Sequence, residues 1–185
     1  MIGNDEEILA LIDKRKTRDK GFRLLVSQTK ERLYWQIRRM VVSHEDTNDL
    51  LQDVYVKVFR NISSFKRDSA LSTWIYRIAF NKTINFLHSK AKRNKDSSVT
   101  IEEEMVQNLK NDKYFNYSAL NLALEKAILT LPDKQRTVFL LRYYDDMPFK
   151  QMAEVLNTNE GALKTSYHIA EKKIREILLQ SGLNF

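Results

Sequence analysis

The sequence has 185 residues, which suffices for one medium hydrophobic core or two small ones. A formal net charge of +7 at pH 7 favours a polyanionic partner, with nucleic acid preferred over a membrane surface. The absence of cysteine excludes disulfides, thiolate metal sites and a cysteine nucleophile.

The numbers of turn-forming residues and the lengths of apolar runs indicate the fold class and the cellular location. Only four glycines and two prolines occur, so the chain lacks the turn residues that a sheet with many hairpins needs, and we expect an all-α protein. Asp5, Glu6 and Glu7 stand where a secretory signal would need positive charge, and no apolar run reaches membrane-spanning length. We therefore expect a cytoplasmic protein without membrane insertion.

The first expected module covers residues 1–92. Apolar residues recur there at helical spacing, with polar breaks near 17–21, 42–46 and 63–72, and the stretch 22–42 is predicted to be one long helix. The next helix, over 46–60, has an apolar inner face, and its predicted outer face consists of Asp49, Gln52, Asp53 and Val56. An acidic face repels DNA and would suit a basic protein partner, although an ordinary solvated face is the alternative.

The helix predicted over 73–93, with Ser72 as its N-cap, is cationic. Residues 69–95 contain six lysines and arginines and no acidic residue. Lys82 falls on the inner face and must extend its stem outward. The predicted outward residues are Trp74, Arg77, Asn81, Asn85 and His88.

An indole with two carboxamides on a cationic helix suits unpaired bases, which stack on aromatic rings and offer their base-pairing edges to asparagine. Tyr76 stands beside this set. The alternative is that Trp74 and Tyr76 are core aromatics and that the amides are merely solvated.

Residues 93–117 mix basic, acidic and small polar residues without a helical period. Such a composition buries little apolar surface, so we expect a flexible linker that stays mobile until a partner holds it. Its aromatic residues Tyr114, Phe115 and Tyr117 would be available for docking.

The second expected module, residues 118–185, begins with Ser118 as an N-cap. Pro132 ends the first helix of this module, and further helices are predicted over 133–144, 149–156 and 160–179. No internal repeat is present.

The last two of these helices form a predicted helix-turn-helix over 148–178, in which either Thr158 or Asn159 caps the second helix. The inner face of that helix is apolar, which leaves hydroxyl, imidazole and ammonium groups free to meet a DNA major groove. An ordinary antiparallel helix pair is the alternative. The candidate DNA-contacting residues are Gly161, Lys164, Thr165, His168 and Lys172.

Taken together, these segments resemble the sigma factors of bacterial RNA polymerase, specifically the short extracytoplasmic-function group. The stretch from DTNDLLQDVYVKVFR to TWIYRIAFNKTINFL is similar to the second conserved region of the family, and LPDKQRTVFLLRYYDDMPFKQMAEVLNTNEGALKTSYHIAEKKIREIL is similar to the fourth. The linker falls where the family has one. Ser166, Ile169 and Glu171 depart from the family, whose recognition helix commonly carries arginines.

The resemblance implies a division of labour. The acidic helix would bind the clamp of the largest subunit of core RNA polymerase, and the loop 65–73 with the helix after it would melt the minus-ten promoter element. Asn81 would contact a flipped-out base, with Trp74 and Tyr76 beside it. The helix-turn-helix would read the minus-35 element, and an anti-sigma factor could hold the protein inactive.

Two other classes of function compete with this interpretation. A self-sufficient regulator that occupies operators would explain only the second module, and it would normally dimerise on a pseudo-palindrome. A nucleic-acid enzyme has less support, because no His, Asp or Glu group has metal-ligand spacing on a predicted folded element. We therefore expect no catalytic residues, no metal site and no cofactor.

Overall fold

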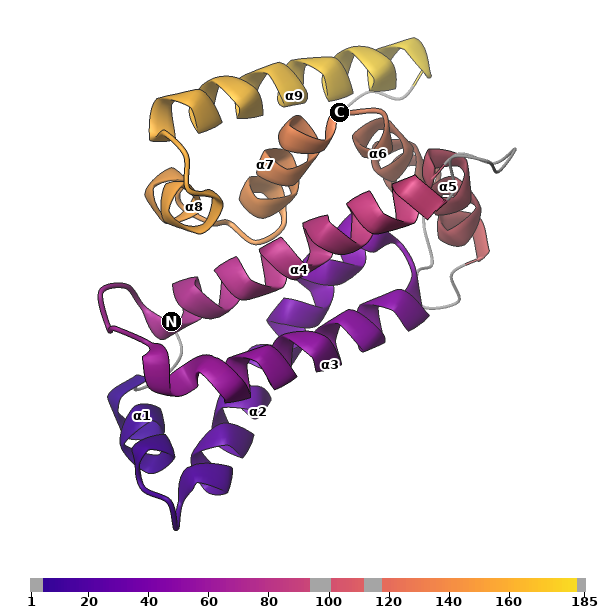
Figure 1. Cartoon of the computed structure of the whole chain (residues 1–185). Coiled ribbons are helices and arrows are strands. Elements are labelled where there is room, and N and C mark those ends of the chain that lie inside the picture. The colour runs from indigo at the N-terminus through magenta and orange to yellow at the C-terminus, as the bar shows by residue number, and fades with distance from the viewer. Residues whose placement is uncertain (1–4, 94–100, 112–117, 183–185) are drawn as a thin grey trace.

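The computed structural model describes residues 5–93, 101–111 and 118–182, and this part of the chain is built from helices and connecting turns. Figure 1 shows α4 crossing the molecule between α3 on one side and the helices α7 and α8 on the other. This confirms the all-α expectation. The helices of the first module are α1 (Asp5–Asp13), α2 (Arg18–Val41), α3 (His44–Asn61), the short 3-10 helix η1 (Ile62–Ser64) and α4 (Leu71–Arg93).

The turns of the first module follow from local chemistry, with one exception. Val42 ends α2 in the left-handed region, with φ of 54°, and the Ser43 side chain then caps α3 by accepting from the Asp46 amide. Ser72 was expected to cap α4, but this prediction is wrong. The helix begins at Leu71, two residues before the predicted start, and the Leu71 amide donates to the Asp5 carboxylate of α1 at 3.0 Å.

A helix also forms where a linker without structure was expected. Residues Ile101–Asn111 make α5, in which Met105 is buried at 2% exposure. The expectation of an aperiodic segment is therefore wrong for these residues, because the helix gains a buried apolar contact and an ion pair with α4. The expected docking of Tyr114, Phe115 and Tyr117 lies outside the described residues.

The second module contains the helices predicted from the sequence. Ser118 caps the first of them by accepting from the Asn121 amide, as expected. Asn159, rather than Thr158, caps the last, accepting from the amides of Gly161 at 2.8 Å and Ala162 at 3.3 Å. The helices are α6 (Ala119–Leu129), α7 (Asp133–Tyr143), α8 (Phe149–Leu156) and α9 (Glu160–Gln180).

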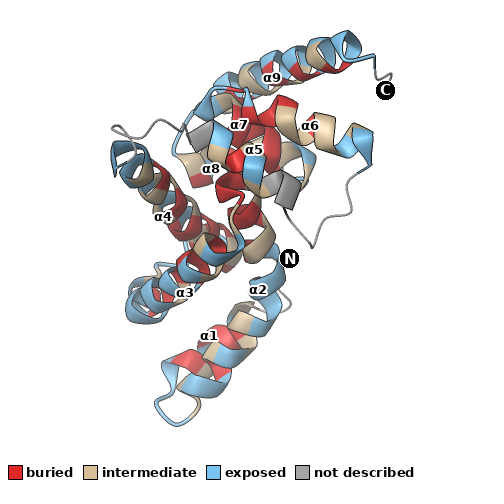
Figure 2. Cartoon of the chain, turned by 90° about the vertical axis from the view of Figure 1, so that its right-hand side faces the viewer, coloured by how far each residue is buried: buried red, intermediate tan, exposed pale blue. Residues whose placement is uncertain are grey.

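The two modules share buried apolar surface. Met147 and Met152 of the second module belong to the same buried cluster as Leu33 and Ile75 of the first, and Met40 of α2 belongs to the cluster of the second. Figure 2 shows buried residues at the centre of the molecule, with exposed residues along the outside of α9. The division into residues 1–92, 93–117 and 118–185 remains a prediction. In the structure, the first and second modules pack against each other through these buried residues.

Polar contacts reinforce this packing. The Arg39 guanidinium of α2 meets the Asp145 carboxylate at 3.1 Å, and Arg32 donates to the backbone carbonyl of Asp145 at 3.0 Å. Arg39 also lies over the Tyr144 ring, 4.3 Å from its centre. The turn after α7 is therefore held against α2 by two arginines.

Candidate nucleic-acid interface

One face of α4 carries an exposed stripe of nitrogen-bearing side chains. Arg77, Asn81, Asn85 and His88 are all exposed, and their spacing of three and four residues places them on the same side of the helix. The opposite side packs into the core through residues such as Ile75 and Ala79. The four side chains can therefore offer hydrogen-bond donors and acceptors to a ligand, while the buried side of α4 fixes the helix to the core. Their exposure is as expected from the sequence.

The two aromatic candidates are less exposed than this stripe. Trp74 is half-buried, with its ring 5.4 Å from that of Phe65 in the preceding loop. Tyr76 is only 6% exposed, and the Arg32 guanidinium lies 5.2 Å from its ring centre. Burial raises the pKa of Tyr76 to about 12, against the opposing charge of Arg32. Placing Tyr76 beside the accessible stripe was wrong, because this ring belongs to the core, and it is not retained as a DNA contact.

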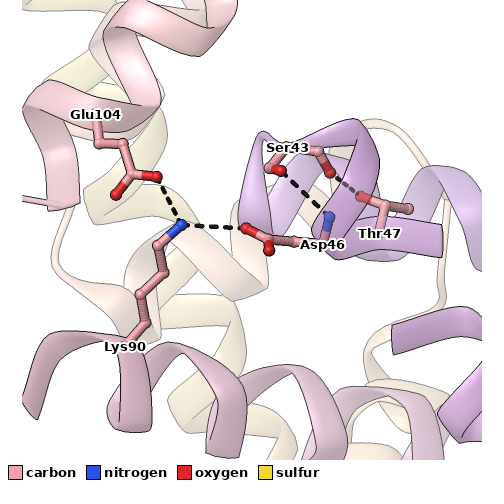
Figure 3. A network of polar contacts seen from close by, with 5 residues as sticks. All are labelled: Ser43, Asp46, Thr47, Lys90 and Glu104. Atoms are coloured by element: carbon pink, nitrogen blue, oxygen red, sulfur yellow. Dashed lines mark hydrogen bonds and ion pairs between the residues drawn. The ribbon is translucent and has the colours of Figure 1, made fainter. Parts of the chain in front are cut away.

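The far end of α4 is anchored by a polar network, which Figure 3 shows from close by. Lys90 donates to Glu104 of α5 at 2.7 Å and to Asp46 of α3 at 3.1 Å. Burial alone would lower the pKa of Lys90, but the hydrogen bonds and charges of the two carboxylates outweigh it and raise that pKa. Lys90 is thus committed to holding three helices together rather than to a ligand.

The outer face of α3 is accessible as predicted. Asp49, Gln52 and Asp53 are exposed, and Val56 is 48% exposed. Lys82, which was expected to extend away from the inner face of α4, reaches the Asp53 carboxylate at 2.7 Å. This ion pair connects the acidic face of α3 to α4.

Sequence reasoning missed Phe59 on this face. Phe59 follows Val56 by three residues and is 37% exposed, which makes it one of the few large apolar side chains at the surface of the described residues. Its ring packs on Phe22 at 5.0 Å between centres, and the Arg18 guanidinium lies 4.7 Å from it. The spacing from Val56 was a usable signal, because both belong to the same helical stripe.

The helix-turn-helix candidates on α9 share one exposed side. Gly161, Thr165, His168 and Lys172 are exposed, as is Lys164 beside them. The other side of α9 is buried through Leu163, Ala170, Ile174 and Leu178. The predicted apolar inner face and exposed outer face of this helix are therefore both present.

The cationic groups of α9 are paired along the helix. Lys164 lies 2.7 Å from Glu160, and Arg175 lies 3.6 Å from Glu171. The Lys172 ammonium lies 4.0 Å from the Glu176 carboxylate. Exposed pairs of this kind are worth less than about 1 kcal/mol and leave the cations able to turn to another anion.

Within the described ranges, no cluster of three or more His, Cys, Asp or Glu side chains is placed to hold a metal ion. Among the same residues, none of the helices combines the length and the apolar character that crossing a bilayer requires.

Comparison with known proteins finds two family models that match this chain. The family model for sigma-70 region 2 matches residues 25–93, and the model for sigma-70 region 4 matches residues 121–174. The first match covers α4 and α3 with most of α2, and the second covers the helix-turn-helix as far as Ile174.

Curated relatives and solved structures extend the likeness to the whole chain. The chain is 30% identical to the ECF RNA polymerase sigma factor SigW of Bacillus subtilis over 89% of its own length and 92% of the relative's. It is 28% identical to the RNA polymerase sigma-H factor of Pseudomonas aeruginosa over 94% of both chains.

Two solved structures share the fold. The structure of CnrH in complex with the cytosolic domain of CnrY has a TM-score of 0.68 at 21% identity, covering 96% of this chain and 97% of the other. The sigma factor RpoE from Bartonella quintana, in complex with the anti-sigma factor NepR, has a TM-score of 0.68 at 18% identity, covering 86% of this chain and 97% of the other. The chain belongs to the extracytoplasmic-function group of the sigma-70 family, whose members bind RNA polymerase and direct it to promoters.

Proposed function

We propose that this sigma factor divides its work among the exposed faces of three helices. The outer face of α3 binds core RNA polymerase at the clamp of its largest subunit, the stripe on α4 reads and opens the minus-ten element, and α9 reads the minus-35 element. The observation that carries the proposal is the α4 stripe, which presents two carboxamides, a guanidinium and an imidazole on a helix without acidic residues.

The chemistry of the α4 stripe suits a melted strand. A carboxamide offers a donor and an acceptor to the base-pairing edge of an extruded base, which Asn81 and Asn85 would supply from adjacent turns. Arg77 and His88 flank them and would meet phosphates or bases. Trp74 retains a supporting part, because its half-buried ring lies at the loop end of the same face.

The polymerase-binding face combines charge with apolar surface. Asp49, Gln52 and Asp53 provide the acceptors, and Val56 with Phe59 provides an apolar centre that a partner would cover. Complementary charge sets the orientation and rate of such an encounter, and the apolar pair provides affinity. Lys82 holds Asp53 toward this face through their ion pair.

Helix α9, the proposed reader of the minus-35 element, would bind DNA more weakly by itself than together with polymerase and α4. Thr165, His168 and Lys172 would meet the major groove, with Lys164 at its edge and Gly161 allowing close approach of the backbone. Their neighbours Glu160 and Glu171 offset part of the positive charge. Much of the affinity for the promoter therefore comes through polymerase and α4.

The proposal extends to partners and location. The protein performs no catalysis of its own, needs no cofactor, and acts in the cytoplasm where polymerase and promoter DNA meet. Two proteins of the same fold were solved with partners, one of them an anti-sigma factor, which supports a partner of that kind for this chain.

Two substitutions in holoenzyme test the division of work. Asn81→Ala should weaken open-complex formation by roughly 1 to 3 kcal/mol and leave core binding unchanged, with Asn48→Ala on α3 as a control for loss of an amide. Permanganate probing of unpaired thymines measures the melting. Unchanged melting would remove Asn81 from the minus-ten surface.

Asp49→Arg should weaken binding to core polymerase by placing like charge against a basic partner. Asp49 is a cleaner choice than Asp53, because reversal at Asp53 would also break the ion pair with Lys82. Glu31→Arg, at an exposed position of α2 outside this face, is the control for charge reversal. Core affinity equal to that of the unmodified chain would refute the assignment of this face.

A further inference from the structure

The turn between α1 and α2 is strongly basic and belongs to none of the three faces. Lys14, Arg15 and Lys16 are consecutive and exposed. Residues 13–20, DKRKTRDK, contain five basic and two acidic residues. A charged turn is usually just solvated, so further observations are needed to give this one a role.

The turn is held rigidly. The Thr17 hydroxyl donates to the Leu11 carbonyl at 2.8 Å, which closes the end of α1. The two helices approach so closely that a Cβ on Gly21 would lie 2.8 Å from the Leu11 Cβ. Ile8 and Ile12 of α1 are buried at 0% and 5% exposure. A ligand would therefore meet basic side chains on a backbone that is already ordered, which reduces the entropy cost of binding.

Helix α1 also links the turn to the loop that precedes α4. Asp5, at the start of α1, accepts from the Leu71 amide at the end of this loop. Asp13, at the other end of α1, meets Arg67 within the loop at 3.0 Å. Figure 1 shows the loop at the start of α1 and the turn at the opposite end of this helix, so the Arg67 side chain extends along α1 to reach the residue before Lys14. Lys66 is exposed in the same loop and adds a further positive charge there.

We propose that the turn Lys14–Lys16 is a further DNA-binding site, which holds backbone phosphates of the promoter strand where it leaves the loop end of α4. The inference rests on the proposed function of α4, and it adds a contact on a different helix pair. Lysine and arginine bind phosphates without regard to base sequence, so the site would stabilise the melted strand in any promoter. Its link to the loop through the Asp13–Arg67 pair favours DNA over an acidic polymerase surface.

The first test uses holoenzyme and the salt dependence of open-complex formation. For a single strand, each phosphate that the protein no longer neutralises reduces the slope of log affinity against log salt by about 0.7. Arg15→Gln with Lys16→Gln removes two cations and should therefore flatten the slope by about 1.4. The matched control neutralises two exposed lysines elsewhere, Lys30→Gln with Lys134→Gln, and should leave the slope unchanged. Equal slopes for the two double variants would overturn the inference.

The second test identifies what the turn contacts. The chain has no cysteine, so Arg15→Cys carries a single photoactivatable thiol reagent into the holoenzyme–promoter complex. Crosslinking to a promoter strand beside the melted segment is the expected result. Crosslinking to a polymerase subunit without DNA, or to neither, would overturn the inference. Asn81→Ala in the same assays separates the outcomes, because normal melting with that variant would refute the proposed function of α4 itself.

Discussion

The ion pair between Arg39 and Asp145 joins the two modules, and its two partners should respond unequally to substitution. The Asp145 side chain is only 7% exposed, whereas Arg39 is 22% exposed and also lies over Tyr144. Burial raises the pKa of Asp145 more than the charges of Arg39 and Arg32 lower it. The charged carboxylate is therefore held at a net cost, despite its close contact with Arg39.

The unequal burial of the two partners sets how much each substitution should change the free energy of unfolding. Removing one partner of a buried ion pair costs about 3 to 5 kcal/mol, but Arg32 remains near Asp145, so Arg39→Gln should lower the free energy of unfolding by about 2 kcal/mol at pH 7. Asp145→Asn removes the charge that burial disfavours and should change the free energy by less than about 1 kcal/mol. Arg39→Lys, which keeps a cation, is the control.

The pH dependence follows from the direction of the pKa shift. A carboxyl whose folded-state pKa is raised contributes stability below its unfolded-state pKa, and this contribution is lost as pH rises through the folded-state pKa. The deficit of Arg39→Gln should therefore shrink between pH 7 and pH 5, because a protonated Asp145 needs no cation.

Urea unfolding followed by circular dichroism measures these free energies at both pH values. Distances between fluorophores on Arg60→Cys and Gln180→Cys report whether the modules separate, since both positions are exposed and the chain has no other cysteine. An equal loss of stability for Asp145→Asn and Arg39→Gln at pH 7 would refute the reasoning.

Three further predictions concern single side chains. Gly21→Ala should lower the free energy of unfolding by about 1 to 3 kcal/mol, because its methyl group would overlap Leu11, and thermal unfolding measures the loss. Asn159→Ala should cost about 1 kcal/mol in urea unfolding, since two amides at the start of α9 lose their acceptor. Glu171→Gln should free Arg175 and steepen the salt dependence of holoenzyme binding to promoter duplex by up to about 0.9, and an unchanged slope would leave Arg175 without a phosphate contact.

Periodicity and capping chemistry predicted most of the helices because these signals are local. The apolar spacing of α9 and the N-cap residues Ser118 and Asn159 act within a few residues of themselves. The exposed face of α3 could be predicted for the same reason. For α3 and α9, the spacing of apolar residues within the helix was enough to separate the buried face from the exposed one.

The errors arose where a distant residue decides the local outcome. Asp5 replaces Ser72 at the start of α4 because the fold brings α1 to the Leu71 amide. Tyr76 is buried because Arg32 and the second module cover its side of the helix. The segment of α5 looked aperiodic because its acidic residues obscure Met105, and one of those acids, Glu104, is bound by Lys90. No window of a few residues contains these partners.

The burial of Met147 and Met152 against the first module limits the distance that the two packed modules can span. Two promoter elements named by their positions ten and 35 lie about 25 base pairs apart, which is about 85 Å along the duplex at 3.4 Å per pair. A packed chain of this length has a radius of gyration of only about 16 Å. With α5 kept helical, the chain between Arg93 and Ser118 could still extend to about 65 Å, so its length permits the modules to separate. On the proposed function, reading both elements at once would expose the methionines that the packed form hides, and contacts with DNA and polymerase would have to exceed that apolar loss.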